Sequence, residues 1–519
     1  MPAPTTERTD KLLDSRIPTK KLINSARITL MSALVMELSG EEGEFREERD
    51  LLGTRRIPRS AYWGIQTLRA QENFGVSQVG LYKYPTLVVA MAMVKKACAL
   101  ANLDLGHLSP DYAEAIVNAC DEIIGGGLLD QFIVDMLQGG AGTSTNMCVN
   151  EVIASRANEM LGEQRNSMTP ISSHDHVNLS QSTNDVYPTA IKIATIYGLR
   201  ELSAGLTRLI DALDEKSTEF KDILKLGRTE MQDAVPITLG QEFSAWSSAL
   251  KRDLQRITAA KEVLKTHNIG ATAIGTSLNA DPEYIELAEK HLIEVTGIQE
   301  LTTAENLIDD TQNSDEFVHA SGLLRVLATN LGKICGDLIL LSSGPVGGFH
   351  EVILPPVQPG SSIMPGKVNP VIPEMVTQVA FQVMGHDLVI TIASQAGQLE
   401  LNAFEPVIAY NFFQALKVLK NAIPILTEKC IKGIKPNPAG LDIVHRSIGL
   451  VTALNPILGY EASTRIAKKA LDTGRPIREI VLQEGLLDEK WLDLILSPKR
   501  MTQAGNVGHR HSKKTDDSS

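Results

Sequence analysis

The sequence predicts a mainly α-helical protein with a bundle of long helices at its centre, and three observations support this fold class. Aromatic residues account for only 4% of the 519 residues, while Ala, Leu, Ile and Met are plentiful, which favours helices over sheets. Apolar residues recur at helical spacing over long stretches in the middle of the chain. Alternation of apolar and polar residues, the pattern of a half-buried strand, does not stand out in any segment.

The composition is that of a soluble globular protein, with 43% hydrophobic and 22% charged residues. The net charge of −12 argues against nucleic acid or an anionic membrane as a partner, although a small anionic substrate can bind at a locally positive site. The longest apolar run, Leu87 to Val94, is far shorter than the roughly 20 residues of a membrane-spanning helix. We therefore expect neither a nucleic acid nor a membrane partner.

The cysteines indicate a reducing, cytoplasmic compartment. They are scattered, no two form a C-x-x-C pair, and the sequence has neither zinc-type spacing nor an H-E-x-x-H motif. We expect reduced and mostly buried thiols at Cys98, Cys120, Cys148, Cys335 and Cys430.

Residues 1–48 are expected to form an N-terminal extension that ends within the acidic run "GEEGEFREERD". A basic stretch followed by "ITLMSALVM" has some features of a targeting helix. The acidic residues Glu7, Asp10 and Asp14 are unlike a transit peptide, and no small-residue cleavage site follows. We therefore expect a loosely attached cytosolic extension.

Residues 49–188 are expected to form an N-terminal domain. It begins with the Pro- and Arg-rich segment "RRIPRSAYWG" and continues with an Ala-rich, mostly helical pattern over residues 86–124, broken near Pro110. The three glycines at 125–127 indicate a helix end and a turn.

Residues 189–437 are expected to form a central helical bundle domain. Apolar residues step by three or four from Phe243 to Ile257, and a second stripe follows the proline-free stretch 316–341. A third long helix is predicted over residues 408–430, with a break at Pro424. Long helices joined by Gly- and Pro-containing segments are typical of an extended bundle.

The remaining residues are expected to form a small C-terminal helical domain (438–500) and a tail (501–519). The tail is polar and contains few apolar residues, so we expect it to be disordered.

Four polar segments lie between the helical stretches. They are "GGAGTSTNM" (139–147), "SQSTNDVYPT" (180–189), "GRTEMQDAVP" (227–236) and "PGSSIMPGKVNP" (359–370). The last is not a phosphate-binding P-loop, because five residues separate Gly360 from Gly366 and Val368 follows Lys367. Each segment alone suits helix caps and turns. Together, with one lysine, they favour a site for a small polyanion.

These segments resemble the aspartase/fumarase superfamily. "GSSIMPGKVNP" is similar to its signature loop, from Gly360 to Pro370 without a gap. The resemblance extends over residues 49–500, through "DLLGTR", "LQGGAGTSTNM", "GRTEMQDAVPITLGQEF", "IGATAIGTSLN" and "LVTALNP". Chance does not account for a match over that span. The resemblance implies a three-domain fold with a long central helical bundle, and a homotetramer whose active sites are shared between subunits.

Within the superfamily, the chain is most similar to the aspartate ammonia-lyases. Three segments resemble the sequences of these enzymes, namely "QGGAGTS" (138–144), "STND" (182–185) and "YWGIQTLRAQENF" (62–74). Fumarases tend to have Ser-Ser-Asn-Asp at the second of these segments. The resemblance implies a carbon–nitrogen lyase that reversibly eliminates ammonia from L-aspartate to give fumarate. It implies no metal or organic cofactor.

That reaction removes a barely acidic proton from Cβ, so the β-carboxylate must accept charge as a dianionic aci-carboxylate. Hydrogen-bond donors aimed at this charge would supply much of the rate enhancement. The loop 359–370 is similar to the family's mobile lid, in which Ser361 would be the general base. A serine can act as a base only if positive partners stabilise its alkoxide in a dry, closed site.

The resemblance also assigns the substrate contacts. The first group would hold the ammonium and the reacting carboxylate and consists of Thr143, Ser182, Thr183 and Asn184. The second group would hold the α-carboxylate and consists of Thr229, Lys367 and Asn369.

Glu230 departs from the family pattern, which often has His at this position and in some aspartases Gln. In the fumarase-type arrangement, that His pairs with a glutamate that aligns with Glu374. Two neighbouring carboxylates cannot easily both ionise, so one should have a raised pKa. We hypothesise that Glu230 is protonated in the complex and donates a hydrogen bond to a substrate carboxylate. Near-normal activity of Glu230→Gln would support this, and a large loss would count against it.

Three further departures leave the identity of the substrate open. Val346 stands where the family commonly has Arg, Cys148 where Asn is usual, and Leu179 where Lys is typical. None removes a catalytic group. The alternatives are a fumarate hydratase, a lyase for an aspartate analogue, or a non-catalytic structural relative. An Ala-Ser-Gly tripeptide at 320–322 lies within a helical apolar stripe and does not indicate the prosthetic group of other ammonia-lyases.

Overall fold

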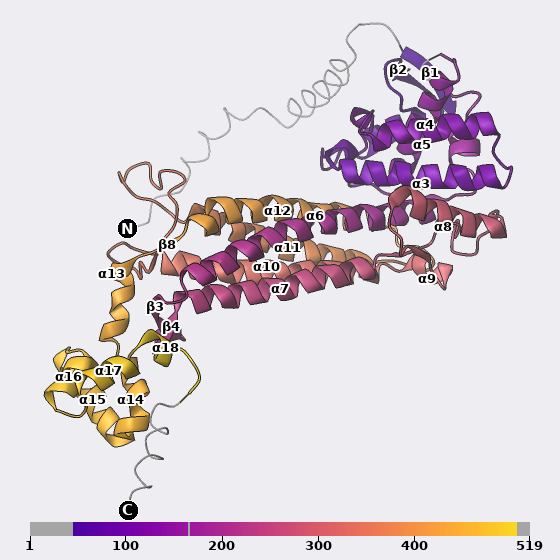
Figure 1. Cartoon of the computed structure of the whole chain (residues 1–519). Coiled ribbons are helices and arrows are strands. Elements are labelled where there is room, and N and C mark those ends of the chain that lie inside the picture. The colour runs from indigo at the N-terminus through magenta and orange to yellow at the C-terminus, as the bar shows by residue number, and fades with distance from the viewer. Residues whose placement is uncertain (1–44, 165–166, 506–519) are drawn as a thin grey trace, which may run out of the picture.

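The computed structural model describes residues 45–164 and 167–505, and over these residues the predicted mainly α-helical fold is confirmed. Figure 1 shows a long helical bundle, with the N-terminal helices at one end and the short C-terminal helices beyond the other. The predicted extension lies outside the described residues up to residue 44, as does the predicted tail from residue 506.

The N-terminal region combines one hairpin with four main helices. Strands β1 (Phe45–Asp50) and β2 (Gly53–Pro58) pair antiparallel. The helices are α2 (Ile65–Asn73), α3 (Pro85–Asp104), α4 (Pro110–Ile124) and α5 (Thr143–Met160), with short turns η1 (Leu81–Lys83), η2 (Leu129–Gln131) and η3 (Ser173–Val177). The break expected near Pro110 is confirmed, because this proline occupies the first turn of α4.

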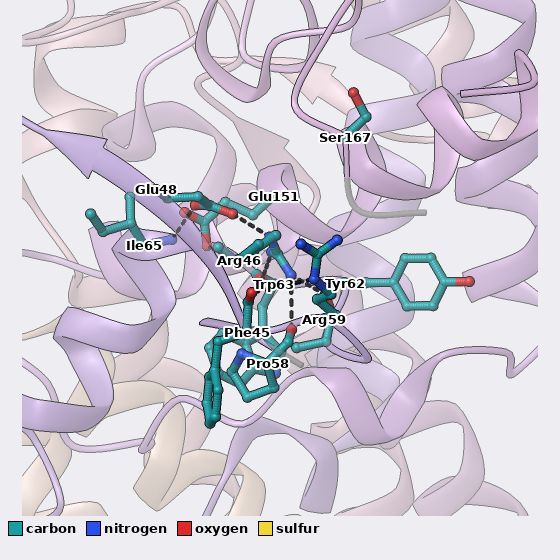
Figure 2. A network of polar contacts seen from close by, with 12 residues as sticks. Phe45, Arg46, Glu48, Pro58, Arg59, Tyr62, Trp63, Ile65, Glu151 and Ser167 are labelled. Atoms are coloured by element: carbon teal, nitrogen blue, oxygen red, sulfur yellow. Dashed lines mark hydrogen bonds and ion pairs between the residues drawn. The ribbon is translucent and has the colours of Figure 1, made fainter. Parts of the chain in front are cut away.

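A polar network joins the hairpin to α5, as Figure 2 shows. Arg46 of β1 donates hydrogen bonds to the carbonyl oxygens of Pro58 (2.9 Å) and Trp63 (2.6 Å). Buried Glu151 of α5 accepts hydrogen bonds from the backbone N–H groups of Gly64 and Gln66, both at 2.8 Å. These bonds fix the position of α5, whose first residue is Thr143.

Five long helices form the bundle. They are α6 (Thr183–Glu219), α7 (Leu239–Glu262), α10 (Asp315–Leu341), α11 (Val371–Gln395) and α12 (Glu405–Lys429). α10 packs on α7 and α11, while α6 packs on α7 and α12. The predicted apolar stripes face the interior, since Phe243 and Leu250 of α7 and Leu331 of α10 are buried. Pro424 does not break the third predicted helix, because α12 continues through it to Lys429.

Shorter elements connect the bundle helices. The helices are α8 (Pro282–Thr296), α9 (Leu307–Gln312) and the turn η4 (Ile431–Gly433). The antiparallel pairs are β3 (Leu224–Thr229) with β4 (Gln232–Thr238) and β7 (Val352–Ile353) with β8 (Lys435–Pro436), and β5 (Thr266–His267) pairs parallel with β6 (Thr302–Thr303). In Figure 1, β3, β4 and β8 lie at the bundle end opposite the N-terminal helices.

The C-terminal helices have a hydrophobic core of their own. The elements are α13 (Pro438–Leu441), η5 (Asp442–Arg446), η6 (Ile448–Leu450), α14 (Val451–Leu458), α15 (Tyr460–Thr473), α16 (Ile477–Gln483), α17 (Glu489–Ile495) and α18 (Pro498–Met501). Their core lies within residues 450–495 and is separate from the cluster shared by the N-terminal region and the bundle. The domain boundaries at 188/189 and 437/438 remain predictions, although α6 runs without interruption through residue 189.

Sequence reasoning missed the strands, and it placed the start of the folded region too late. Residues 45–48, assigned to the extension, belong to β1 and pair with β2. β1 has the sequence "FREERD" and no fully buried residue, so it lacks the apolar alternation that reveals a strand. Its pairing depends on backbone hydrogen bonds and on the network around Arg46 rather than on a hydrophobic face.

Two described helices, α3 and α11, are long and apolar enough to cross a membrane by length and composition alone. α3 is a core helix of the N-terminal region, with Leu87, Met91 and Val94 fully buried. α11 is different, because Phe381, Leu388 and Ile392 are each more than half exposed. Their spacing of seven and four residues puts them on one face of the helix.

Candidate active site

The first predicted contact group lies where the N-termini of α5 and α6 meet. Thr143 is the first residue of α5 and is exposed, and Ser182 is the N-cap of α6. Asn146 of α5 donates a hydrogen bond from Nδ2 to Oγ1 of Thr183 at 3.1 Å, which ties the two helix ends together. Two helix N-termini pointing to one place favour a negatively charged group there, through their free N–H groups and dipoles.

Buried polar side chains form a hydrogen-bond network around Asn146, the residue that bonds to Thr183. Oδ1 of Asn178 accepts hydrogen bonds from Lys95 Nζ (3.0 Å), Asn146 Nδ2 (3.1 Å) and Asn150 Nδ2 (3.0 Å). Lys95 is fully buried, and burial lowers the pKa of its ammonium group to about 8. The network therefore places a cationic group beneath the α6 N-terminus without exposing it to solvent.

Asp185 and Asn184 connect the α6 N-terminus to the 269–279 segment. Oδ1 of Asp185 accepts from the backbone N–H of Ser182 (3.1 Å), and Oδ2 accepts from that of Thr272 (3.0 Å). Burial raises the pKa of Asp185 to about 7, although both backbone bonds favour its ionised form. Asn184 donates from Nδ2 to the carbonyl oxygen of Ala273 at 2.7 Å. Ser182 and Asp185, which cap the N-terminus of α6, thus also take part in joining segments that are distant in the sequence.

Gly142, the N-cap of α5, allows Tyr187 of α6 to approach the backbone. Its φ is +91°, and a Cβ atom there would lie 2.3 Å from the Tyr187 ring. Gly126 has the same φ of +91° but no atom within 4 Å of such a Cβ. The close packing of Tyr187 on Gly142 sets the distance between the two helix ends.

We expect Gly142→Ala to destabilise the protein much more than Gly126→Ala does. Both substitutions force alanine into a left-handed conformation, which costs about 1 kcal/mol. Only Gly142→Ala also overpacks the Tyr187 contact, which should add about 1–3 kcal/mol. Denaturant unfolding of both variants measures the difference. Equal losses of unfolding free energy would show that the Tyr187 contact does not constrain this backbone.

Hydrogen bonds within the loop 359–370 join its two ends. The backbone N–H of Gly360 donates to the carbonyl oxygen of Lys367 (2.7 Å), and Asn369 Nδ2 donates to that of Gly360 (2.7 Å). A Cβ atom on Gly360 would lie 2.8 Å from the Lys367 oxygen, so only glycine fits there. Oγ of Ser361 accepts from the backbone N–H groups of Ile363 (3.2 Å) and Met364 (3.0 Å).

Two cavities adjoin this loop. One, of about 460 Å³, is lined by Lys367, Asn369 and Glu374 together with His350 and Ser343. The other, of about 480 Å³, is lined by Ser361 and Lys367. The structure thus brings Ser361, Lys367, Asn369 and Glu374 into one neighbourhood, with Lys367 common to both cavities.

Thr229 and Glu230 lie at the tip of the β3–β4 hairpin and are exposed. The two-residue turn consists of Glu230 (φ +54°) and Met231 (φ +63°), both in the left-handed region. Neither is glycine, so the turn stores strain that the surrounding structure must offset. Strained backbone next to a predicted substrate contact supports a functional role for this turn. The predicted pairing of Glu230 with Glu374 stays a prediction.

The predicted site residues form two groups that one chain cannot bring together. Thr183 is at the start of α6, and α6 has 37 residues, which span about 55 Å at 1.5 Å per residue. Lys216, near the end of α6, donates a hydrogen bond to the carbonyl oxygen of Ile434 (3.1 Å), next to β8, and β8 pairs with the strand that precedes the loop. Thr229 ends β3, the first strand after α6. Thr143 and residues 182–184 therefore lie at one end of the bundle, and the hairpin and loop residues at the other (Figure 1).

The other departures from the family pattern lie in different settings. Val346 is almost completely exposed. Cys148 is buried in α5, and burial raises the pKa of its thiol to about 12. Leu179 contributes its carbonyl oxygen, which accepts a hydrogen bond from Asn102 Nδ2 at 3.1 Å. Sequence reasoning did not find Lys95 or Asn178, because a buried lysine among alanines gives no motif.

Among residues 45–164 and 167–505, no group of three or more His, Cys, Asp or Glu side chains is placed to hold a metal ion. The described cysteines are free and buried.

Comparisons with known proteins give concordant results. The family described as "Lyase" matches residues 53–385, and "Fumarase C C-terminus" matches residues 450–503. An aspartate ammonia-lyase from Pseudomonas aeruginosa is 54% identical over 458 residues, which cover 88% of this chain and 96% of that protein.

Two solved structures show the same fold. The crystal structure of a fumarate lyase:delta crystallin from Brucella melitensis bound to cobalt has a TM-score of 0.87 and 50% identity, over 89% of this chain and 100% of that one. A class II fumarase from Schistosoma mansoni has a TM-score of 0.83 and 34% identity, over 90% of this chain and 100% of that one.

Proposed function

The chain belongs to the lyase family that includes the aspartate ammonia-lyases, and on this premise we propose that it reversibly eliminates ammonia from L-aspartate to give fumarate. The observation that carries the proposal is the 54% identity to an aspartate ammonia-lyase over nearly the whole of both chains. The fumarase similarity is lower, at 34%. The chain also has Ser182, Thr183 and Asn184 at the tip of α6, in the "STND" text that resembles the ammonia-lyases.

We propose that Ser361 removes the Cβ proton. Its Oγ already accepts two backbone hydrogen bonds, from Ile363 and Met364, and these donors would stabilise an alkoxide. Lys367 lines the same cavity and would add positive charge. Closure of the loop would remove water and strengthen both interactions.

The developing charge on the β-carboxylate needs donors at the other contact group. The N-termini of α5 and α6 and the hydroxyl of Thr183 would supply them, and Thr143 would do so once its hydroxyl leaves the Gly140 carbonyl oxygen, to which it donates at 2.7 Å. Thr229, Lys367 and Asn369 would hold the α-carboxylate. Glu230, protonated, would donate a hydrogen bond to a substrate carboxylate, with Glu374 as its supporting neighbour.

Because the two groups are about 55 Å apart along α6, we propose that subunits of a homotetramer combine them into each active site. The exposed face of α11, with Phe381, Leu388 and Ile392, is a suitable subunit contact, since soluble monomers rarely leave such apolar surface uncovered. A cytoplasmic location, with no nucleic acid or membrane partner, belongs to the same proposal. It is supported by the reduced cysteines and the negative charge.

The direct test measures the ultraviolet absorbance of fumarate after pure protein is mixed with L-aspartate or, separately, with L-malate. We expect fumarate from L-aspartate only. Fumarate from L-malate only would instead establish a fumarate hydratase. No fumarate from either would leave a lyase for an aspartate analogue or a non-catalytic relative.

A further inference from the structure

Glu351 is a fully buried carboxylate that the proposed reaction does not use. Its main chain is fixed on two sides. The backbone N–H donates to the carbonyl oxygen of Leu341 at the end of α10 (2.8 Å), and its carbonyl oxygen accepts from the backbone N–H of Asn437, next to β8 (2.9 Å). The residue therefore sits at a junction between the bundle and the segment that leads into the loop 359–370.

The carboxylate of Glu351 forms ion pairs with two cations of β3. Oε1 lies 2.7 Å from Arg228 Nη1, and Oε2 lies 3.3 Å from Lys225 Nζ. Within the described part of the chain, these are the only polar contacts found for either oxygen, and they are ion pairs without hydrogen-bond geometry, so the two cations hold the carboxylate by charge. Lys225 also pairs with Glu242 of α7 at 3.2 Å. Buried Lys225 and partly buried Arg228 thus share two carboxylates, and loss of Glu351 leaves them with one.

The guanidinium group of Arg228 contacts an aromatic ring with its flat face, in addition to its ion pair with Glu351. Its guanidinium carbon lies 4.1 Å from the centre of the Phe349 ring, two residues before Glu351. Arg228 directly precedes Thr229, and the β3–β4 register shifts between Leu226 and Arg228. Beyond this shift Arg228 and Thr229 pair with β4 again, and the ion pair and the ring contact tie this outer end of the hairpin to residues 349–351.

Residues on either side of Glu351 line a cavity that residues of the loop 359–370 also line. His350, Val352 and Ile353 line the 460 Å³ cavity together with Lys367 and Asn369. A shift of Glu351 would therefore move the floor of this cavity and the Thr229 turn together. Glu351 itself is fully buried and is in no position to touch a substrate.

We propose that Glu351 is a positioning residue of the active site. It holds the Thr229 turn and the segment that leads into the loop 359–370 together as one rigid unit. The consequence for catalysis rests on the proposed function, which assigns Thr229, Lys367 and Asn369 to substrate binding. The structural part of the proposal does not rest on the proposed function. It states only that the ion pairs of Glu351 hold the Thr229 turn and the segment that leads into the loop 359–370 together.

The experiment compares Glu351→Gln with Asp253→Asn. Asp253 is an equally buried carboxylate that accepts from Arg256 (2.7 Å) and Asn330 (2.8 Å) and joins α7 to α10, away from the turn and the loop. Both variants exchange a buried carboxylate for an amide. Arg228→Lys is a milder third variant, because it keeps the charge but loses the planar fork and the ring contact.

Two readouts are needed, namely steady-state kinetics with L-aspartate and deuterium exchange of backbone amides. We expect Glu351→Gln to lower kcat/KM roughly ten- to hundredfold, mainly through KM, and Arg228→Lys to lower it several-fold. Amides of residues 224–238 and 359–370 should exchange faster, while those of α3 to α5 should not change. Asp253→Asn should keep KM within about twofold of the wild type.

Wild-type KM and exchange in both Glu351→Gln and Arg228→Lys would overturn the proposal. A KM that rises equally in Asp253→Asn would reduce the effect to general destabilisation and would also overturn it. If Glu351→Gln does not fold, Arg228→Lys decides by the same two readouts. If the wild type makes no fumarate, the proposed function fails, while the exchange data still decide whether Glu351 holds the turn and the segment that leads into the loop together.

Discussion

Ser361→Ala should lower kcat for fumarate formation from L-aspartate by about 10²- to 10⁴-fold, the usual contribution of a positioned general base. The substitution removes the only atom of this residue that can accept the Cβ proton. It removes the acceptor for the N–H groups of Ile363 and Met364, but it keeps the bonds from Gly360 to Lys367 and from Asn369 to Gly360, which join the two ends of the loop. We therefore expect KM to change much less than kcat. The initial rate of absorbance change, with aspartate varied, measures both.

Ser362→Ala is the matched control, because Ser362 is the next residue of the loop, is exposed and carries the same hydroxyl. It should keep kcat within a few-fold of the wild type. A Ser361→Ala variant that retained more than roughly a tenth of the wild-type kcat would fall outside the range of a general base. The proton would then have to go to another group.

Mixing two inactive variants should restore activity if active sites are shared between subunits. Thr183→Val removes a hydroxyl from one end of the bundle, and Ser361→Ala removes the base from the other end. Each homotetramer should be nearly inactive. After unfolding and refolding together in equal amounts, random assembly should leave roughly a quarter of the sites with both wild-type groups. Activity should therefore rise from near zero to about a quarter of the wild-type value.

The control for this experiment pairs two variants of the same end, Ser361→Ala and Lys367→Ala. Both lie on the loop 359–370, so every mixed site receives one defective loop or the other, and no activity should return. Failure of the Thr183→Val and Ser361→Ala mixture, with tetramers confirmed by light scattering, would show that each site is built within a single chain. That outcome would require a fold in which α6 does not separate the two groups.

The helical bundle could be predicted from the sequence, because the buried apolar residues of its helices recur at helical spacing. Phe243, Leu250 and Leu331 face the interior at helical spacing, and the structure confirms this. The hairpins have no such pattern. β1 has no fully buried residue, and β3 combines buried Leu226 with exposed Thr229 at its tip. The predicted break at Pro424 was wrong, because the packed helix α12 accommodates this proline within its length.

The site was predictable only where a motif recorded it. The loop 359–370 and the "STND" segment could be recognised by their text, and the structure places them at helix ends and cavities. The contacts that support them are long-range. Glu351 meets Arg228 across 123 positions of sequence, and Tyr187 meets Gly142 across 45. No local pattern encodes such pairs, because each partner looks ordinary among its own neighbours.

If the exposed apolar face of α11 is the proposed subunit contact, the stability of this protein depends on its concentration. A chain with Phe381, Leu388 and Ile392 in water is less favoured than one with them covered by other subunits. Part of the free energy of folding is then released only on assembly, so the protein is least stable when it is most dilute. In the proposed assembly, a newly synthesised subunit would expose this apolar face until it met its partners, and it would be prone to aggregate during that interval.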